Sequence, residues 1–160
     1  MITIRDHLPD DLLAITNLFN AIVSDGTSFM SEEALSVAAM ASKIASMRYT
    51  AVALKDNVVI GCYWIHDNMP GRGSHIANAT YCVGLSHRNQ GIGRALAEHS
   101  LASARIMGYR GMQFNGVVCT NAPSVHLWES LGFIRVGIIP GGFRATNEQY
   151  QDIAIYYRAL

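Results

Sequence analysis

The sequence contains little charge, and the charge that it has is balanced. Charged residues make up 15% of the 160 residues, with 12 lysines and arginines against 12 acids and a formal net charge of zero. Half of the residues are apolar, which excludes an intrinsically disordered chain. A neutral chain has no overall field that would recruit nucleic acid or an anionic membrane, so we expect neither as a partner.

Long hydrophobic runs are also missing, and no leader peptide is expected. The apolar runs fall well short of the roughly 20 residues that a membrane helix needs. Residues 1–6 contain no basic stretch followed by an apolar core, so a signal peptide is not expected. For a chain of this length we expect one domain, covering residues 1–160, with a hydrophobic core of its own.

Cysteine is scarce, with only Cys62, Cys82 and Cys119. These three lie in apolar, strand-like runs and lack the spacing of metal ligands. We therefore predict reduced, buried thiols in a cytoplasmic protein without a metal site. A catalytic cysteine stays open as an alternative, although no motif ties a histidine or a basic residue to any of the three.

Apolar periodicity and turn residues predict an α+β chain built on a single mixed, mostly antiparallel sheet. The expected strands cover residues 2–5, 50–54, 58–66, 75–85, 112–119, 133–139 and 151–158. The expected helices cover residues 9–22, 31–47, 91–107 and 121–131, and Ser31 is the expected N-cap of the second. About seven strands are thus flanked by about four helices. Residues 24–30 are expected to form a covering loop, and Pro140–Arg144 a glycine-rich connection between the last two strands.

One stretch, residues 83–96, organises the rest of the chain. It begins at the end of a strand-like run, passes through a polar turn with Gly91 and Gly93, and enters a helix. Such a turn directs several backbone N–H groups at one point, where the helix N-terminus adds partial positive charge. Arg88 and Arg94 flank the glycines. The pattern predicts a diphosphate-binding site rather than a plain strand-to-helix connection.

Two motifs make the chain resemble the GNAT superfamily of N-acetyltransferases. The first, preceded by Val83 and followed by Ala95-Leu96, is Arg88-x-x-Gly91-x-Gly93. The second is Asn121-x-x-Ser124-x-x-Leu127-Trp128-x-x-Leu131-Gly132-Phe133. Their order and separation are also those of the family. The resemblance implies the GNAT fold, transfer of an acetyl group from acetyl-CoA to an amine, and, as in many family members, a possible homodimer.

A narrower resemblance concerns the acceptor. The segments Ser74–Ala79 and Gly108–Asn121 resemble the branch that acetylates proline analogues such as azetidine-2-carboxylate. In that branch, the asparagines that match Asn78 and Asn115 line the acceptor site. The resemblance implies a small amino acid or amino-acid analogue as the acceptor. The chain also lacks an acidic cluster of the kind that would bind a polyamine or an aminoglycoside.

The donor contacts expected from the two motifs lie along the pantetheine and diphosphate of coenzyme A. Val83 is expected to pair with the pantetheine amides where its strand splays, and Asn121 to contact the pantetheine arm while capping a helix. Backbone amides of the glycine turn are expected to hold the diphosphate. The predicted cofactor-binding residues are Val83, Arg88, Asn89, Gln90, Gly91, Ile92, Gly93, Arg94, Asn121 and Ser124.

The acid and base of the reaction have more than one interpretation. Many family members have a tyrosine where Trp128 stands, and its phenol protonates the leaving thiolate, whereas tryptophan has no such proton to give. Water and Tyr81 are both open as proton donors, although Tyr81 also fits a core position. Asn78 is expected to fix a water or the acceptor amine, so Asn78 and Tyr81 are the predicted catalytic residues. Histidines often carry protons in active sites, but His75 and His126 fit structural positions better.

The acceptor is expected to contact Asn78, Asn115, Phe29 and Arg144. The asparagines supply amide groups, Phe29 an apolar wall and Arg144 a partner for a carboxylate. We expect direct attack within a ternary complex, without an acyl-enzyme. Two alternatives keep the same fold: an acetyltransferase of protein or peptide N-termini, with an open groove, and a module that binds acyl-CoA without turnover.

Overall fold

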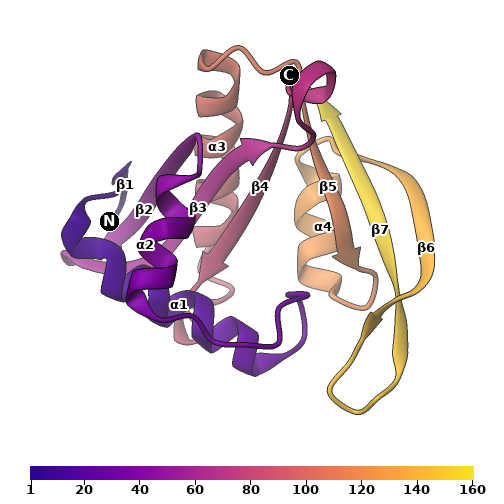
Figure 1. Ribbon diagram of the computed structural model, residues 1–160, viewed down its shortest axis with the longest axis horizontal. Coiled ribbons are helices and arrows are strands. Elements are labelled where there is room, and N and C mark those ends of the chain that lie inside the picture. The colour runs from indigo at the N-terminus through magenta and orange to yellow at the C-terminus, as the bar shows by residue number, and fades with distance from the viewer.

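The computed structural model describes residues 1–160 and contains one seven-stranded sheet with strand order β1-β2-β3-β4-β5-β7-β6 (Figure 1). The strands are β1 (Ile2–Asp6), β2 (Tyr49–Lys55), β3 (Val58–Asp67), β4 (Ile76–Val83), β5 (Gly111–Val118), β6 (Ile134–Arg144) and β7 (Tyr150–Ala159). The helices are α1 (Leu12–Asp25), α2 (Val37–Ala45), α3 (Ile92–Ile106) and α4 (Ala122–Ser130). Only β4 and β5 pair in parallel, so the predicted α+β class and the mixed, mostly antiparallel sheet are confirmed.

Each face of the sheet carries its own hydrophobic core. Residues of α1 and α2, among them Ile15 and Met40, pack with Trp64 on one face. Residues of α3 and α4, among them Leu96, pack with Tyr63 on the other. Neighbouring strand residues point to opposite faces, which is why Tyr63 and Trp64 belong to different cores. None of the helices is both long and apolar enough to cross a membrane.

The second helix begins later than the sequence predicts. The prediction placed its N-cap at Ser31, but the helix starts at Val37, and the Ser36 hydroxyl accepts the Ala39 N–H at 3.1 Å. The backbone of Leu35 is held by Asn20 of α1, through bonds of 2.8 and 2.9 Å. Because these bonds fix Leu35 outside a helix, the segment before it stays irregular, and its residues 28–31 line a cavity of the protein.

The glycine-rich segment Pro140–Arg144 is also different from the prediction. It lies within β6 and is not a connection, because a register shift between Ile139 and Phe143 absorbs its extra residues. The N–H of Gly141 donates to the Asp152 carboxylate at 2.9 Å, and Phe143 packs on Ile153. The connection between β6 and β7 is therefore residues 145–149.

Strands β4 and β5 separate soon after they meet. Their pairing is limited to Ile76 with Gly111 and Ala77 with Met112. Figure 1 shows the two strands diverging beyond this point, so that a gap opens in the middle of the sheet. The predicted strand 75–85 ends at Val83, because residues 85–87 form a short 3-10 turn at the mouth of the gap.

Candidate active site

Strand β4 presents an unpaired backbone edge to the gap. Along an antiparallel strand, the backbone N–H and C=O groups of successive residues point alternately to its two neighbours. The bond from the Gly84 N–H to the Ile60 carbonyl of β3, at 2.9 Å, shows which residues along β4 face β3. The even-numbered residues of β4 therefore bond to β3. The N–H and C=O groups of Ala79, Tyr81 and Val83 point toward β5, which is no longer paired there.

The loop after β4 offers a row of free backbone donors. The N–H groups of residues 89–94 have no acceptor within the protein, and the first helical bond of α3 runs from Ala95 to Gly91 at 3.0 Å. Asn89 and Gly91 have φ angles of 61° and 79°, and such left-handed residues turn successive N–H groups toward one side. Six free donors beside a helix N-terminus form an anion site.

Two arginines flank this anion site, and each is partly engaged. Arg88 pairs with Asp25 at the end of α1 at 3.1 Å, and bonds from Thr27 and Arg88 hold the pKa of that carboxyl below its usual value. Arg94 pairs with Glu98 at 3.2 Å and donates to Ser130 at 2.6 Å. Both guanidiniums stay about half exposed, so each keeps donors for an anion.

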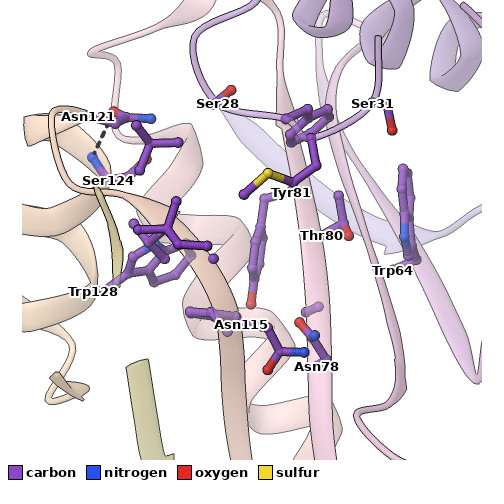
Figure 2. Close-up of a pocket in the computed structure, with 18 of the residues that line it drawn as sticks. Ser28, Ser31, Trp64, Asn78, Thr80, Tyr81, Asn115, Asn121, Ser124 and Trp128 are labelled. Atoms are coloured by element: carbon purple, nitrogen blue, oxygen red, sulfur yellow. Dashed lines mark hydrogen bonds between the residues drawn. The ribbon is translucent and has the colours of Figure 1, made fainter. Parts of the chain in front are cut away.

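A cavity of about 430 Å³ lies at the gap, within the usual range of small-molecule sites. Its walls come from α1, the loop before α2, α2 itself, β3, β4, β5, α4 and β7. Figure 2 shows Trp64 and Trp128 on opposite sides of it, with Asn78 close to Asn115. Lys43 is the only charged residue among the twenty that line the cavity, and none of them is acidic or a histidine.

Three asparagines meet at the point where β4 and β5 separate. The side-chain oxygen of Asn68 accepts from the Asn78 amide at 3.1 Å and from the Asn115 amide at 2.8 Å. Gln113 in turn donates to the Asn115 oxygen at 2.9 Å. The cluster fixes the rotamers of both cavity asparagines, and it leaves the Asn78 oxygen free to accept a bond from a ligand.

The residue before Asn68 anchors this cluster. The Asp67 carboxylate accepts from the Tyr109 hydroxyl at 2.5 Å and lies 3.6 Å from Arg48. Burial, and then the bond to Asp67, raise the pKa of Tyr109 to about 12. The Asn68 N–H itself donates to the Ile76 carbonyl at 2.8 Å. The Tyr109–Asp67 bond and the Asn68–Ile76 backbone bond hold the chain around Asn68 in place, so its side-chain oxygen is a fixed acceptor.

Tyr81 contributes its ring to the cavity, while its hydroxyl is engaged on the α3 side. The hydroxyl lies 2.7 Å from Ser100 Oγ and 3.5 Å from the sulfur of Met112. Burial raises the pKa of Tyr81 far above its usual value, so the phenol stays protonated. Trp128 packs on Tyr81 and Phe114, with ring centroids 5.0 and 4.4 Å apart. The tryptophan is therefore part of an aromatic wall.

The other predicted site residues divide between the cavity and its surroundings. Asn121 and Ser124 line it, and the Asn121 side chain accepts the Ser124 N–H at 3.4 Å, which confirms the predicted helix cap. Phe29 also lines it and packs on Phe19 at 5.4 Å. Arg144 is not among the lining residues, because it pairs with Glu32 at 2.7 Å.

The cysteines are free, and two of them are buried as predicted. Cys62 and Cys82 face each other across β3 and β4, whereas Cys119 is only partly buried. Burial and the neighbouring Cys62 thiol raise the pKa of Cys82 well above its usual value, although the nearby Lys43 charge lowers it. A thiol with a raised pKa is a poor nucleophile, which argues against Cys82 as a catalytic cysteine.

Four residues of the site were not singled out from the sequence: Asn68, Lys43, Trp64 and Thr80. Asn68 lies in a polar loop, and only the pairing of His66 with Asn78 brings it to the cavity. Lys43 did carry a signal, because it is one of two lysines in the chain and stands in an otherwise uncharged helix.

Comparisons with known proteins agree on one family. The model of the acetyltransferase (GNAT) family matches residues 15–133. The N-acetyltransferase aca1 of Schizosaccharomyces pombe is 44% identical over 99 residues, which are 61% of this chain and 47% of that protein. The chain therefore matches only about half the length of this curated relative.

Solved structures extend the similarity to the whole chain. A GCN5-related N-acetyltransferase from Kribbella flavida is 34% identical, with a TM-score of 0.93 over 99% of this chain and 98% of that one. A phosphinothricin acetyltransferase from Sinorhizobium meliloti, solved with acetyl-CoA, has the same TM-score over 99% and 88% of the two chains. At 24% identity, the second similarity concerns the fold alone.

Proposed function

The chain belongs to the acetyltransferase (GNAT) family, whose enzymes use acetyl-CoA, and we propose that it acetylates the amine of a small amino acid or amino-acid analogue. The observation that carries this proposal is the cavity between β4 and β5. It joins the unpaired edge of β4 to the asparagine cluster, and its volume of about 430 Å³ suits a small acceptor.

The donor side of the proposal rests on free backbone groups. Acetyl-CoA supplies the acetyl group as an activated thioester. The six unpaired N–H groups of residues 89–94 fit its diphosphate, with Arg88 and Arg94 beside them. The backbone groups of Val83 and Tyr81 that face the gap fit the amides of the pantetheine arm. Asn121 and Ser124 line the same cavity from α4.

The acceptor side of the proposal rests on side chains that line the cavity. Asn78 and Asn115 are oriented by Asn68, and the free oxygen of Asn78 is suited to accept a bond from the acceptor amine. Phe29 closes the cavity from the loop before α2. An acceptor held here lies next to the unpaired edge of β4, which is the arrangement that direct attack in a ternary complex requires.

Protons are exchanged with water in this proposal. The cavity contains no acid and no histidine to serve as a base, and Asn78 has no titratable group. The Tyr81 hydroxyl bonds to Ser100 on the α3 side, and Trp128 has no acidic proton to give. Water is therefore our choice between the two donors considered for the leaving thiolate, and Asn78 positions the amine rather than deprotonating it.

Release of coenzyme A thiol tests the proposal. The purified protein is mixed with acetyl-CoA and a panel that includes azetidine-2-carboxylate, methionine sulfoximine, common amino acids, spermidine and a peptide with a free N-terminus. We expect amino-acid-dependent thiol release and N-acetylated products by mass spectrometry. Turnover of the peptide alone, or of no amine at all, would contradict the small-amino-acid assignment. The family match does not favour either alternative, the peptide enzyme or the non-catalytic module.

A homodimer through strand β6 is a further part of the proposal. This strand forms the outer edge of the sheet, and Ile134, Val136, Ile138 and Ile139 on it are 45–61% exposed. An apolar edge strand with free backbone groups can pair with the same strand of a second copy about a twofold axis. Sedimentation velocity should show a dimer for the native chain and a monomer for Ile138→Lys. A monomeric native chain at micromolar concentration would contradict it.

We also propose a cytoplasmic location for the protein. Cys62 and Cys82 lie opposite each other on adjacent strands and remain free thiols, which fits a reducing compartment. Fractionation of cells that carry a tagged native chain should recover it with cytoplasmic markers, and recovery with an oxidising compartment would contradict the proposal.

A further inference from the structure

Lys43 is the one charged side chain that reaches the cavity, and its charge is not neutralised by the protein. It projects from α2 over strand β3, with Nζ 5.8 Å from the centre of the Trp64 ring. All seven ion pairs of the protein are made by arginines. The cavity therefore carries a single positive charge, which rests on an aromatic face and lacks a carboxylate partner.

The position of this charge relative to the gap follows from strand register. Trp64 of β3 lies directly opposite Thr80 of β4, so both side chains point to the same face of the sheet. Asn78 is two residues from Thr80 and shares that face. Lys43 rests on Trp64, and β3, which carries Trp64, is the strand next to β4, about 4.8 Å away. Lys43, Thr80 and Asn78 line the same cavity of about 430 Å³.

We propose that Lys43 binds the carboxylate of the acceptor, and that the enzyme thereby selects amines that carry an anionic group. This inference rests on the proposed function, because it places the acceptor in the same cavity. The amine faces the edge of β4 and Asn78, and the carboxylate lies toward α2, where Lys43 supplies a charge-assisted hydrogen bond. Arg144 does not take this role, because it pairs with Glu32 outside the cavity.

The same charge has two chemical consequences. A polyamine or aminoglycoside would bring several positive charges into a cavity that already holds one, and no acid there compensates them. Pairing with Lys43 also neutralises the acceptor carboxylate, which otherwise stabilises the adjacent ammonium. The acceptor amine therefore loses its proton to water more readily when it is bound than when it is free.

A binding experiment tests the role of Lys43 without relying on turnover. Protein saturated with coenzyme A is titrated calorimetrically with azetidine-2-carboxylate and with azetidine-2-carboxamide, which differ only in the anionic group. The native chain should bind the carboxylate more tightly. Lys43→Gln should bind it roughly 10- to 100-fold more weakly, with little change for the carboxamide. Lys55→Gln is the matched control, since Lys55 is the only other lysine and lies on the exposed β2–β3 hairpin.

The outcomes separate this inference from the proposed function. Selective binding of the carboxylate that depends on Lys43, without acetyl transfer to any amine, would support Lys43 as the anchor and contradict the proposed activity. Acetylation of amino acids with the same KM and the same carboxylate preference in Lys43→Gln would support the activity and overturn the anchor. Failure of the native chain to bind the carboxylate would also overturn it. An unchanged affinity of Lys43→Gln for coenzyme A shows that the variant is folded.

Discussion

At the scale of single residues, one amide oxygen orients two side chains of the proposed acceptor site. Asn68 accepts from both Asn78 and Asn115 but does not itself line the cavity, so it is a positioning residue. Asn68→Ala should raise the KM for the acceptor about tenfold, as expected for the loss of hydrogen-bonded orientation, with kcat and the KM for acetyl-CoA changed less than about twofold. Steady-state kinetics with each substrate varied in turn measures this split.

The control for Asn68 is its exposed neighbour Met69, whose replacement by alanine should leave all kinetic constants unchanged. Loss of kcat in Asn68→Ala without a change in the acceptor KM would contradict the positioning role. Equal affinity of both variants for coenzyme A shows that the donor site is intact.

Tyr81 offers a direct test of the proton donor. Its hydroxyl bonds to Ser100, which lies on α3, so Tyr81→Phe should lower kcat by less than about threefold. The lost hydrogen bond should still destabilise the fold by about 1 kcal/mol, measurable by urea denaturation. A hundredfold fall in kcat, with normal binding of both substrates, would instead identify the phenol as the acid that protonates the thiolate.

The pH dependence of the reaction should follow the acceptor amine, because the cavity offers no group that titrates near neutrality. Burial keeps the Tyr81 phenol protonated well past neutrality, and no acid or histidine lines the cavity. We expect kcat/KM to rise tenfold per pH unit as the free acceptor loses its proton, and to level off near the pKa of the acceptor amine. Initial rates between pH 5.5 and 9.5 measure the profile. A separate inflection between pH 6 and 7 would reveal a protein base that the structure does not place there.

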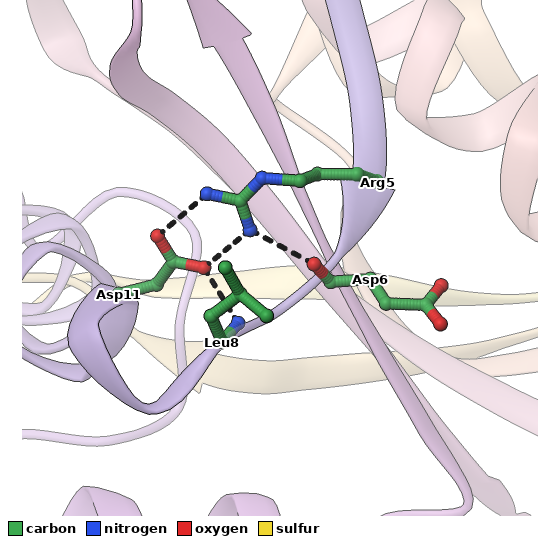
Figure 3. A network of polar contacts seen from close by, with 4 residues as sticks. All are labelled: Arg5, Asp6, Leu8 and Asp11. Atoms are coloured by element: carbon green, nitrogen blue, oxygen red, sulfur yellow. Dashed lines mark hydrogen bonds and ion pairs between the residues drawn. The ribbon is translucent and has the colours of Figure 1, made fainter.

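At the scale of elements, a single carboxylate connects the first strand to the first helix. Figure 3 shows Asp11 accepting hydrogen bonds from the two terminal guanidinium nitrogens of Arg5 and from the N–H of Leu8. The donor–acceptor distances are 2.7 and 3.0 Å for Arg5 and 2.7 Å for Leu8. These bonds, with the Arg5 bond as the main cause, hold the pKa of Asp11 below its usual value. The folded form is thus favoured when Asp11 is ionised, and this stabilisation is lost as the pH falls through the lowered pKa.

Asp11→Asn should therefore be less stable than the native chain at pH 7, by about 1 kcal/mol, a value typical of side-chain caps. The difference should stay constant above about pH 5 and shrink below pH 4. Denaturant titrations at several pH values measure it. Asp10→Asn is the matched control, because Asp10 is exposed in the same turn. A difference that persists unchanged at pH 2.5 would contradict the role given to the carboxylate.

The elements that the sequence predicted well are those whose cause is local. The turn from β4 into α3 depends on Gly91 and on residues next to it in the chain, and Asn121 caps α4 through a residue three positions away. The start of α2 depends instead on Asn20, which lies 15 residues before the Leu35 that it holds. A bond across that separation leaves no periodic pattern, so the serine and acids at 31–33 indicated a helix that does not form there.

At the scale of the whole molecule, the proposed acceptor site is assembled from elements that are distant in the chain. Lys43, Trp64 and Asn115 come from α2, β3 and β5, and only the strand order brings them together. The resemblance to the family branch drew attention to the two asparagines. Lys43 carried only a compositional signal, which points to the cavity only once it is known which face of the sheet α2 covers. Arg144 was expected at the cavity for its charge, yet the course of β6 takes it to Glu32.

The early separation of β4 and β5 gives a strand in the middle of the sheet one protected side and one open side. In hydrogen exchange of the free protein, we expect slow amides at Thr80 and Cys82, which bond to β3, and fast ones at Tyr81 and Val83. Coenzyme A should slow the fast pair and leave the slow pair unchanged, as followed residue by residue by NMR. Uniform protection along β4 without ligand would contradict it. Such a pattern would mean that coenzyme A takes the place of a neighbouring strand, because it would bond to the side of β4 that β5 leaves open.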